Sequence, residues 1–191
     1  MSFSDFKAFE LISKAIPKNY MVQSGNSSAI RYLQLFEFES SIHLYCNRGT
    51  SGIDGSTSTA VGASVVSKFP TLLITGDLSF FYDINGLWNN YISDNFKIIV
   101  INNNGGGIFR ILPGNDNSEL FETYFETKHH RSAKTLAQDF GFTYSSADSI
   151  ATLNDALFAF FDDNSTPKLL EIFTPYSEND KILLSYFDQL V

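Results

Sequence analysis

Short apolar runs alternate with amphipathic stretches along the whole chain, a pattern typical of βαβ units that build a parallel sheet. The runs 72–74 and 98–101 are continuously apolar, as expected of central strands that are covered on both faces. We therefore predict an α/β fold with an open, mostly parallel sheet of about six strands and helices on both faces. The predicted strands are Tyr20–Gln23, His43–Cys46, Thr71–Thr75, Lys97–Ile101, Thr143–Ser145 and Lys168–Phe173.

Helical patterns fill the segments between these strands. Pro17 ends the first helix, and Gly141 stands in the usual stop position after a later one. The stretch 102–118 is irregular and follows a predicted central strand, where long loops are often functional. The predicted helices lie near Ser4–Ile16, Ser28–Phe38, Ser56–Ser67, Ile84–Ile92, Ser132–Phe140, Ser149–Phe161 and Asn179–Leu190.

Composition narrows the class of protein. The 191 residues, 43% of them apolar, suit a single domain over 1–191. The net charge of −8, without any basic run, argues against binding to nucleic acid or to a membrane surface. No apolar run approaches the roughly 20 residues that span a bilayer. Cys46 is the single cysteine, which excludes an intrachain disulfide and fits a reducing, cytoplasmic setting.

Three polar or glycine-rich segments follow predicted strands, at 47–55, 76–79 and 102–107. Ligands of open α/β sheets bind beyond the carboxyl ends of the strands, so we expect these segments to converge on one crevice. There Asp77, Asn103 and the carbonyl of Gly105 would supply hard oxygen ligands. A diphosphate and water would complete the octahedral shell that Mg²⁺ prefers.

Gly76-Asp77-Leu78, followed by Asn102-Asn103, resembles the metal- and diphosphate-binding motif of thiamine-diphosphate enzymes. Leu78 stands where most of that superfamily has glycine. The version with Leu78 and Ser79 is characteristic of SEPHCHC synthases (2-succinyl-5-enolpyruvyl-6-hydroxy-3-cyclohexene-1-carboxylate synthases). Three further stretches resemble the same family: Gly25-Asn26-Ser27 with Arg31, Asn47 through Gly55, and Asn102 through Gly106 with Ile108-Phe109.

The resemblance implies the thiamine-diphosphate-binding fold and a role for each matching residue. It implies Mg²⁺ ligands at Asp77, Asn103 and Gly105, although a one-residue slip to Asn104 stays open. Ile53 would support the bent middle of the cofactor. The implied cofactor-binding set is Asn26, Ser27, Gly52, Ile53, Asp77, Leu78, Ser79, Asn103 and Gly105. The implied substrate-binding set is Arg31 and Arg48, for carboxylates, with Ile108, Phe109 and Leu112 as an apolar wall.

The implied activity belongs to a larger, menaquinone-pathway enzyme. Such an enzyme decarboxylates 2-oxoglutarate on thiamine diphosphate and adds the four-carbon product to isochorismate. In the family a pyrimidine-binding domain precedes this one and supplies a glutamate that contacts the cofactor. We expect that domain and a middle domain to be absent here, and the chain alone to be inactive and to form homo-oligomers. The alternatives are another thiamine-diphosphate decarboxylase or carboligase, and a non-catalytic module.

Simpler interpretations exist for several residues. Asp77 could cap a helix, and the Asn-Gly run could be a polar turn. A dinucleotide site is disfavoured because no Gly-x-Gly-x-x-Gly follows the first strand. Neither Ser51 nor Ser79 lies in a Gly-x-Ser-x-Gly elbow, which argues against a hydrolase. His129 and His130 are expected in a solvated loop, with an active-site lip as the alternative.

Overall fold

A computed structural model describes residues 2–112 and 118–189. It contains a six-stranded sheet in the order β2-β1-β3-β4-β6-β5, in which every neighbouring pair is parallel. The predicted α/β class with an open parallel sheet is therefore confirmed. The strands are β1 (Met21–Ser24), β2 (His43–Cys46), β3 (Thr71–Gly76), β4 (Phe96–Asn102), β5 (Thr143–Ala147) and β6 (Lys168–Phe173).

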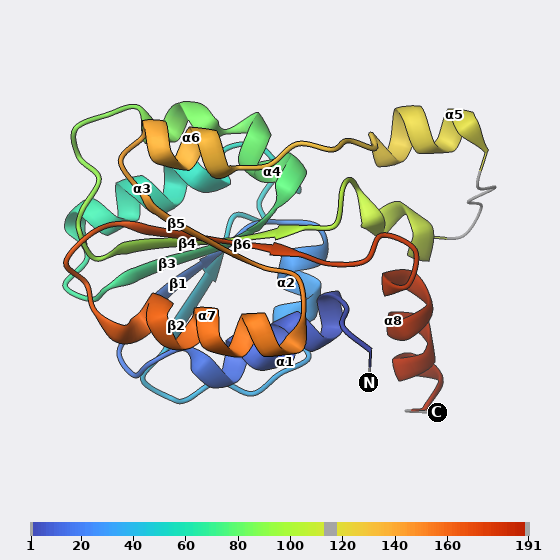
Figure 1. Ribbon diagram of the computed structural model, residues 1–191, viewed down its shortest axis with the longest axis horizontal. Coiled ribbons are helices and arrows are strands. Elements are labelled where there is room, and N and C mark those ends of the chain that lie inside the picture. The colour runs from blue at the N-terminus through green and yellow to red at the C-terminus, as the bar shows by residue number, and fades with distance from the viewer. Residues whose placement is uncertain (1, 113–117, 190–191) are drawn as a thin grey trace.

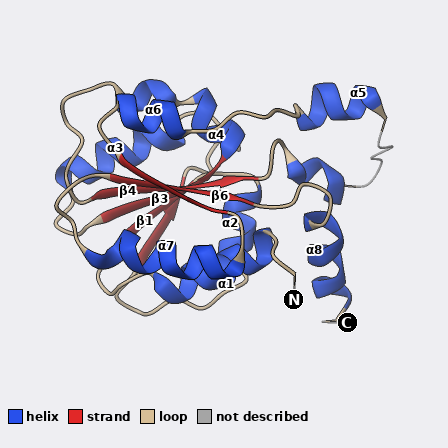
Figure 2. Ribbon diagram, in the orientation of Figure 1, coloured by secondary structure: helices blue, strands red, loops and turns tan. Residues whose placement is uncertain are grey.

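Helices cover both faces of the sheet, which runs through the middle of the molecule (Figures 1 and 2). Alternate residues of β4 point to opposite sides: Ile99 and Ile101 belong to one apolar cluster, Ile98 and Val100 to the other. The first cluster is covered by α1 (Asp5–Ala15), α2 (Ser28–Leu33), α7 (Ile150–Asp162) and α8 (Asn179–Asp188). The second is covered by α3 (Ser56–Val66), α4 (Asp77–Tyr82) and α6 (Lys134–Asp139).

Local signals explain where the long helices begin. Ser4 precedes α1, and its hydroxyl accepts a hydrogen bond from the Lys7 amide at 3.3 Å. Ser149 precedes α7 and forms a reciprocal capping box with Thr152. Both caps satisfy amide groups that the first helical turn leaves without a partner.

Two helical predictions were wrong in detail. The segment that begins at Asp77 was predicted as a loop, but it forms α4. The helix predicted at Ile84–Ile92 is only the single 3₁₀ turn η1 (Ile84–Leu87). Asp83 lies between them, and its carboxylate accepts hydrogen bonds from the Ser58 amide at 2.7 Å and the Ser58 hydroxyl at 2.6 Å. This tie to α3 turns the chain away from a continued helix.

The other boundaries differ less. The helix predicted at Ser28–Phe38 ends at Leu33, whereas Leu190, the predicted end of the last helix, lies outside the described residues. The long segment after β4 is mostly irregular, as predicted, with residues 113–117 outside the description. Its short helical pieces are η2 (Gly107–Ile111), α5 (Glu119–Phe121) and η3 (Glu122–Glu126).

The order of the strands creates a switch point between β1 and β3. From β1 the chain passes through α2 to β2 on one side, whereas β3 leads through α4 to β4 on the other. The connections after β1 and β3 therefore diverge, which opens a crevice at the carboxyl ends of these strands. None of the helices in the described ranges is both long and apolar enough to cross a membrane.

Candidate functional site

A cavity of about 460 Å³ lies at this switch point. Its wall comes from the segments after β1, β2, β3 and β4, so the predicted convergence of three loops on one crevice holds. All fourteen residues that the sequence nominated for the site line this cavity: Asn26, Ser27, Arg31, Arg48, Gly52, Ile53, Asp77, Leu78, Ser79, Asn103, Gly105, Ile108, Phe109 and Leu112. Asn104, the alternative metal ligand, is not part of the wall.

Asp77 is the first residue of α4 and is buried, with 2% of its surface exposed. Its Oδ1 accepts a hydrogen bond from the Leu78 amide at 2.7 Å, and its Oδ2 accepts one from the Gly105 amide at 3.0 Å. The amino end of a helix favours a negative charge. Both oxygens of Asp77 are therefore fixed at the cavity wall, one of them by the loop that follows β4.

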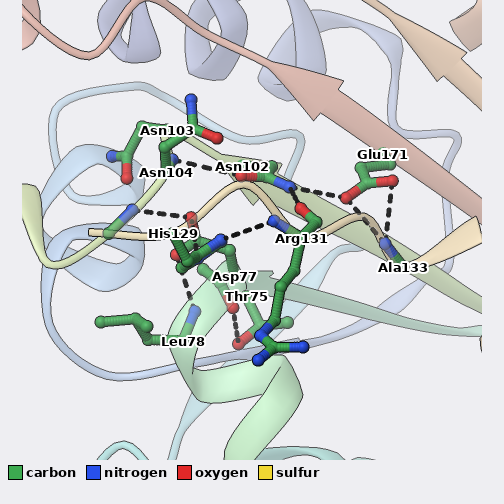
Figure 3. A network of polar contacts seen from close by, with 12 residues as sticks. Thr75, Asp77, Leu78, Asn102, Asn103, Asn104, His129, Arg131, Ala133 and Glu171 are labelled. Atoms are coloured by element: carbon green, nitrogen blue, oxygen red, sulfur yellow. Dashed lines mark hydrogen bonds and ion pairs between the residues drawn. The ribbon is translucent and has the colours of Figure 1, made fainter. Parts of the chain in front are cut away.

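His129 also contacts this carboxylate, which corrects the expectation of a solvated loop. Its side chain is 10% exposed, and Nε2 lies 3.2 Å from Asp77 Oδ2 (Figure 3). Nδ1 accepts a hydrogen bond from the Arg131 amide at 3.1 Å, so a neutral ring carries its proton on Nε2, toward Asp77. His130 is exposed, and the two histidines share no site.

Asp5 is a site residue that the sequence did not indicate. It opens α1, lines the cavity and is 2% exposed. Its Oδ2 accepts a hydrogen bond from Asn103 Nδ2 at 2.9 Å, and its Oδ1 accepts one from Thr174 Oγ1 at 2.5 Å. Burial, with a smaller contribution from the charge of Asp77, raises the pKa of Asp5 to about 6.

Glu171 anchors the loop after β4 from behind (Figure 3). This fully buried carboxylate accepts hydrogen bonds from Asn102 Nδ2 at 2.7 Å, from the Ser132 hydroxyl at 2.6 Å and from the Tyr144 hydroxyl at 2.8 Å. Asn102 Oδ1 in turn accepts the Asn104 amide at 3.2 Å. The first residue of the Asn-Asn-Asn run thus fixes the turn, and the second reaches the cavity.

The segments after β1 and β2 are held together at the opposite wall. Asn26 Oδ1 accepts a hydrogen bond from Arg48 at 2.9 Å, and its Nδ2 donates to the Gly52 carbonyl at 3.2 Å. Arg31 donates to the Ser27 carbonyl at 2.8 Å. Both arginine side chains belong to exposed residues at the cavity mouth. They provide positive charge beside an acidic interior.

Several residues with positive φ angles lie at or next to the same cavity. Ser27 (φ 66°) and Ser51 (φ 60°) line it, and Asn104 (φ 66°) lies between two lining residues. Gly105 has φ 152°, and a Cβ there would lie 2.6 Å from the Glu126 carbonyl oxygen. Non-glycine residues with positive φ are uncommon and concentrate at functional sites.

The donor set fits a divalent cation that is shared with a phosphate ligand. Asp77 provides a carboxylate, Asn103 an amide and Gly105 a backbone carbonyl, all from residues of the cavity wall. Within the described ranges no group of three or more His, Cys, Asp and Glu side chains could hold a metal by itself. Mg²⁺ is commonly bound by one or two carboxylates together with substrate phosphates, and this wall offers that arrangement.

The sequence of residues 24–172 matches the family model of the thiamine pyrophosphate enzyme, C-terminal TPP binding domain. The chain belongs to this family. The matched range contains β2 to β5, all of β6 except Phe173, the last residue of β1, and most of the cavity wall. Thiamine pyrophosphate is thiamine diphosphate, so the family agrees with the resemblance seen in the Asp77 and Asn103 motifs.

Individual members of this family are closely similar to the chain. It is 59% identical over 186 residues to a 2-succinyl-5-enolpyruvyl-6-hydroxy-3-cyclohexene-1-carboxylate synthase of Christiangramia forsetii. Synthases of the same name from Flavobacterium johnsoniae and Porphyromonas gingivalis are 57% and 46% identical. These alignments cover 97–100% of this chain but only 32–34% of the relatives. The chain thus spans about a third of the length of the curated relatives that it matches.

Proposed function

We propose that this domain binds thiamine diphosphate with Mg²⁺ and forms part of a SEPHCHC synthase, a transferase. In that enzyme 2-oxoglutarate would be decarboxylated and its four-carbon remainder added to isochorismate, a step of menaquinone biosynthesis. The relatives carry the name of this synthase. The observation that supports the metal site most directly is the meeting of Asp77, Asn103 and Gly105 at one cavity, with the Gly105 amide bonded to Asp77.

One part of the wall would bind the cofactor and its metal. Asp77, Asn103 and the Gly105 carbonyl would hold the metal against the diphosphate. Asn26 and Ser27 would donate hydrogen bonds to the diphosphate. The family resemblance implies that Ile53 would contact the middle of the cofactor. Ser79 Oγ donates a hydrogen bond to the Ile53 carbonyl at 2.5 Å and so fixes the loop that carries Ile53. Gly52, Leu78 and Ser79 complete this part of the wall. The bound cofactor would supply the carbanion chemistry.

Substrate carboxylates would bind at the mouth of the cavity. Arg31 and Arg48 present guanidinium groups there, and guanidinium pairs well with carboxylate through two parallel hydrogen bonds. Both also donate to nearby oxygens within the chain, which limits the positions they adopt. Ile108, Phe109 and Leu112 form an apolar wall on the side of η2 and would exclude water from the carbon chain of a substrate.

The reaction would need a second domain. The described residues that line the cavity include no glutamate, and the family resemblance implies a glutamate from a pyrimidine-binding domain. We propose that such a domain covers the open cavity and that the enzyme is a homo-oligomer in the cytoplasm. We therefore expect these 191 residues alone to show no turnover with 2-oxoglutarate, isochorismate, thiamine diphosphate and Mg²⁺. Turnover of about one per second, ordinary for an enzyme, would contradict this part.

Calorimetry tests the proposed binding. The purified chain is titrated with thiamine diphosphate in the presence of Mg²⁺, then with EDTA in place of Mg²⁺, and finally with unphosphorylated thiamine. We expect saturable heat only with thiamine diphosphate and Mg²⁺ together, since metal and diphosphate complete each other's contacts. Equal binding of thiamine and thiamine diphosphate would contradict a diphosphate site, and no binding at millimolar ligand would contradict cofactor binding by this domain.

A further inference from the structure

Asp5 and Asn103 lie 98 residues apart in the sequence, yet they share a buried hydrogen bond of 2.9 Å. Asp5 is at the start of α1, and Asn103 follows the central strand β4. Burying a carboxylate is costly unless its oxygens accept hydrogen bonds. Here both oxygens do so, one from Asn103 and the other from Thr174.

The bond determines which atom of the Asn103 amide faces the cavity. In this bond Asn103 Nδ2 is the donor and Asp5 Oδ2 the acceptor, because the amide nitrogen of asparagine donates whereas its amide oxygen only accepts. The two atoms point in different directions from the same carbon. With Nδ2 committed to Asp5, Oδ1 is the atom of this side chain that is left for a ligand.

We propose that Asp5 is a positioning residue, which holds the Asn103 amide so that Oδ1 faces the cavity as a ligand for a divalent cation. This inference rests on the proposed function, since it concerns the same metal. Residues behind a metal ligand orient it, and their loss typically weakens metal binding by about 10- to 100-fold. Asp5 would do this from another element of the fold, so the ligand would depend on the docking of α1.

A purely structural role for Asp5 is the competing explanation. The Asp5 backbone amide donates to Asn179 Oδ1 at 2.8 Å, which already joins α1 to the start of α8 without using the carboxylate. The Thr174 contact joins α1 to the segment after β6. The Asn103 contact is the one that reaches the cavity, so variants that separate these two contacts distinguish the explanations.

Three substitutions make this separation. In Asp5→Asn the new side chain retains an oxygen that can accept from Asn103, while its NH₂ group can donate to the Thr174 hydroxyl. Asp5→Leu has the same branched shape, with larger methyl groups in place of the oxygens, but no acceptor. Thr174→Val removes the hydroxyl donor and leaves the Asp5–Asn103 bond intact. If Asp5→Leu fails to fold, as judged by circular dichroism, Asp5→Ala replaces it.

The measurement is the dissociation constant of thiamine diphosphate at several Mg²⁺ concentrations, determined by calorimetry on the whole chain. We expect Asp5→Leu to weaken Mg²⁺-dependent binding by about 10- to 100-fold, with partial recovery at high Mg²⁺. Asp5→Asn and Thr174→Val should stay within about threefold of the wild type, because both preserve an acceptor for Asn103. Recovery by Asn would also exclude the negative charge of Asp5 as the cause.

A spectroscopic signature accompanies the binding data. The side-chain NH₂ group of Asn103, assigned in a ¹H–¹⁵N spectrum by its loss in Asn103→Asp, should shift in Asp5→Leu and stay close to its wild-type position in Thr174→Val. Wild-type affinity in Asp5→Leu would overturn the inference and leave the proposed function intact. A wild-type chain without Mg²⁺-dependent binding would overturn both.

Discussion

Charged side chains are buried at both the carboxyl and the amino end of the sheet, but their surroundings differ. At the carboxyl end, Asp5 and Asp77 are buried beside a cavity, and Glu171 is buried behind it. At the amino end, Lys97 is fully buried and donates to the Asp163 carbonyl at 2.7 Å, with its ammonium 5.5 Å from the Phe160 ring centre. Lys97 is enclosed by loop and helix, whereas Asp5 and Asp77 face space that a ligand can fill.

Burying a charge costs free energy at both ends, but the buried charges have different roles. The Lys97 ammonium is satisfied within the chain, so its burial affects stability alone. At the carboxyl end the hydrogen bonds of Asp5, Asp77 and Glu171 hold a glycine-rich turn in a defined shape. At that end the buried carboxylates therefore support a binding site. Substitutions at the two ends should therefore change different measurable quantities, and the following predictions start with the largest effect.

Glu171→Ala should have the largest effect on stability. The change removes the acceptor for Asn102, Ser132 and Tyr144 and for the Ala133 amide. Each buried donor without a partner costs about 1–3 kcal/mol, so we expect a loss of about 4 kcal/mol or more in the free energy of unfolding, measured with urea. Glu171→Gln should cost less, since hydroxyl groups can turn to donate or accept. Equal losses would contradict the hydrogen-bond explanation.

Gly105→Ala should lower both stability and cofactor binding. The backbone there has φ 152°, and the added Cβ would lie 2.6 Å from the Glu126 carbonyl oxygen. Strain of this kind costs about 1–3 kcal/mol, and relief by movement of the turn would displace the proposed metal ligands. The unfolding free energy and the dissociation constant of thiamine diphosphate provide the two readouts.

Gly62→Ala is the matched control for this glycine. Gly62 lies inside α3, and a Cβ there would meet no atom within 4 Å. Alanine in an exposed helix interior should raise stability by about 0.5–1 kcal/mol and leave binding unchanged. Similar losses in both variants would show that the Gly105 effect is not specific to the turn.

Lys97→Met should have a smaller effect that depends on pH. Burial lowers the pKa of Lys97 from 10.5 to about 8. Between these values the unfolded chain binds more protons than the folded chain, so stability rises with pH. We expect the wild type to gain about 1–2 kcal/mol relative to Lys97→Met between pH 7.5 and 10. Unfolding by urea at each pH measures this gain.

The exposed Lys68 supplies the control for the pH series. Lys68→Met should keep a constant difference from the wild type over the same range, because its charge is solvated in both states. A constant difference for Lys97→Met as well would mean that the buried ammonium does not titrate as its surroundings imply.

The sheet and the place of the cavity were accessible from local patterns in the sequence. Apolar runs such as 98–101 marked the strands, and the ends of those strands marked the segments that meet at the cavity. The individual wall residues, such as Ile53 and Phe109, came from the resemblance to a known family. The prediction agrees less well with the structure where the chain turns back on itself. The tie between Asp83 and Ser58, which ends α4, joins residues from two helical segments that no periodicity connects.

The supporting residues of the site were missed for the same reason. Asp5 looked like an ordinary residue of a first helical turn, and His129 like part of a charged loop. Their partners Asn103 and Asp77 lie far away in the sequence and meet them only after the sheet has formed. Glu171 gave one local signal, a charged residue inside an otherwise apolar strand. Such a residue needs buried donors, although the sequence does not identify them.

Binding of thiamine diphosphate by Asp77→Asn tests the central claim most directly, with Lys97→Met from the opposite end of the sheet as control. Asn keeps the shape of Asp77 but has one acceptor oxygen for the Leu78 and Gly105 amides, which Asp77 binds with two, and it loses the charge that a cation requires. We predict that Asp77→Asn folds with a somewhat lower unfolding temperature and weakens Mg²⁺-dependent binding by more than about 100-fold, while Lys97→Met binds like the wild type. Wild-type affinity in Asp77→Asn would contradict the account.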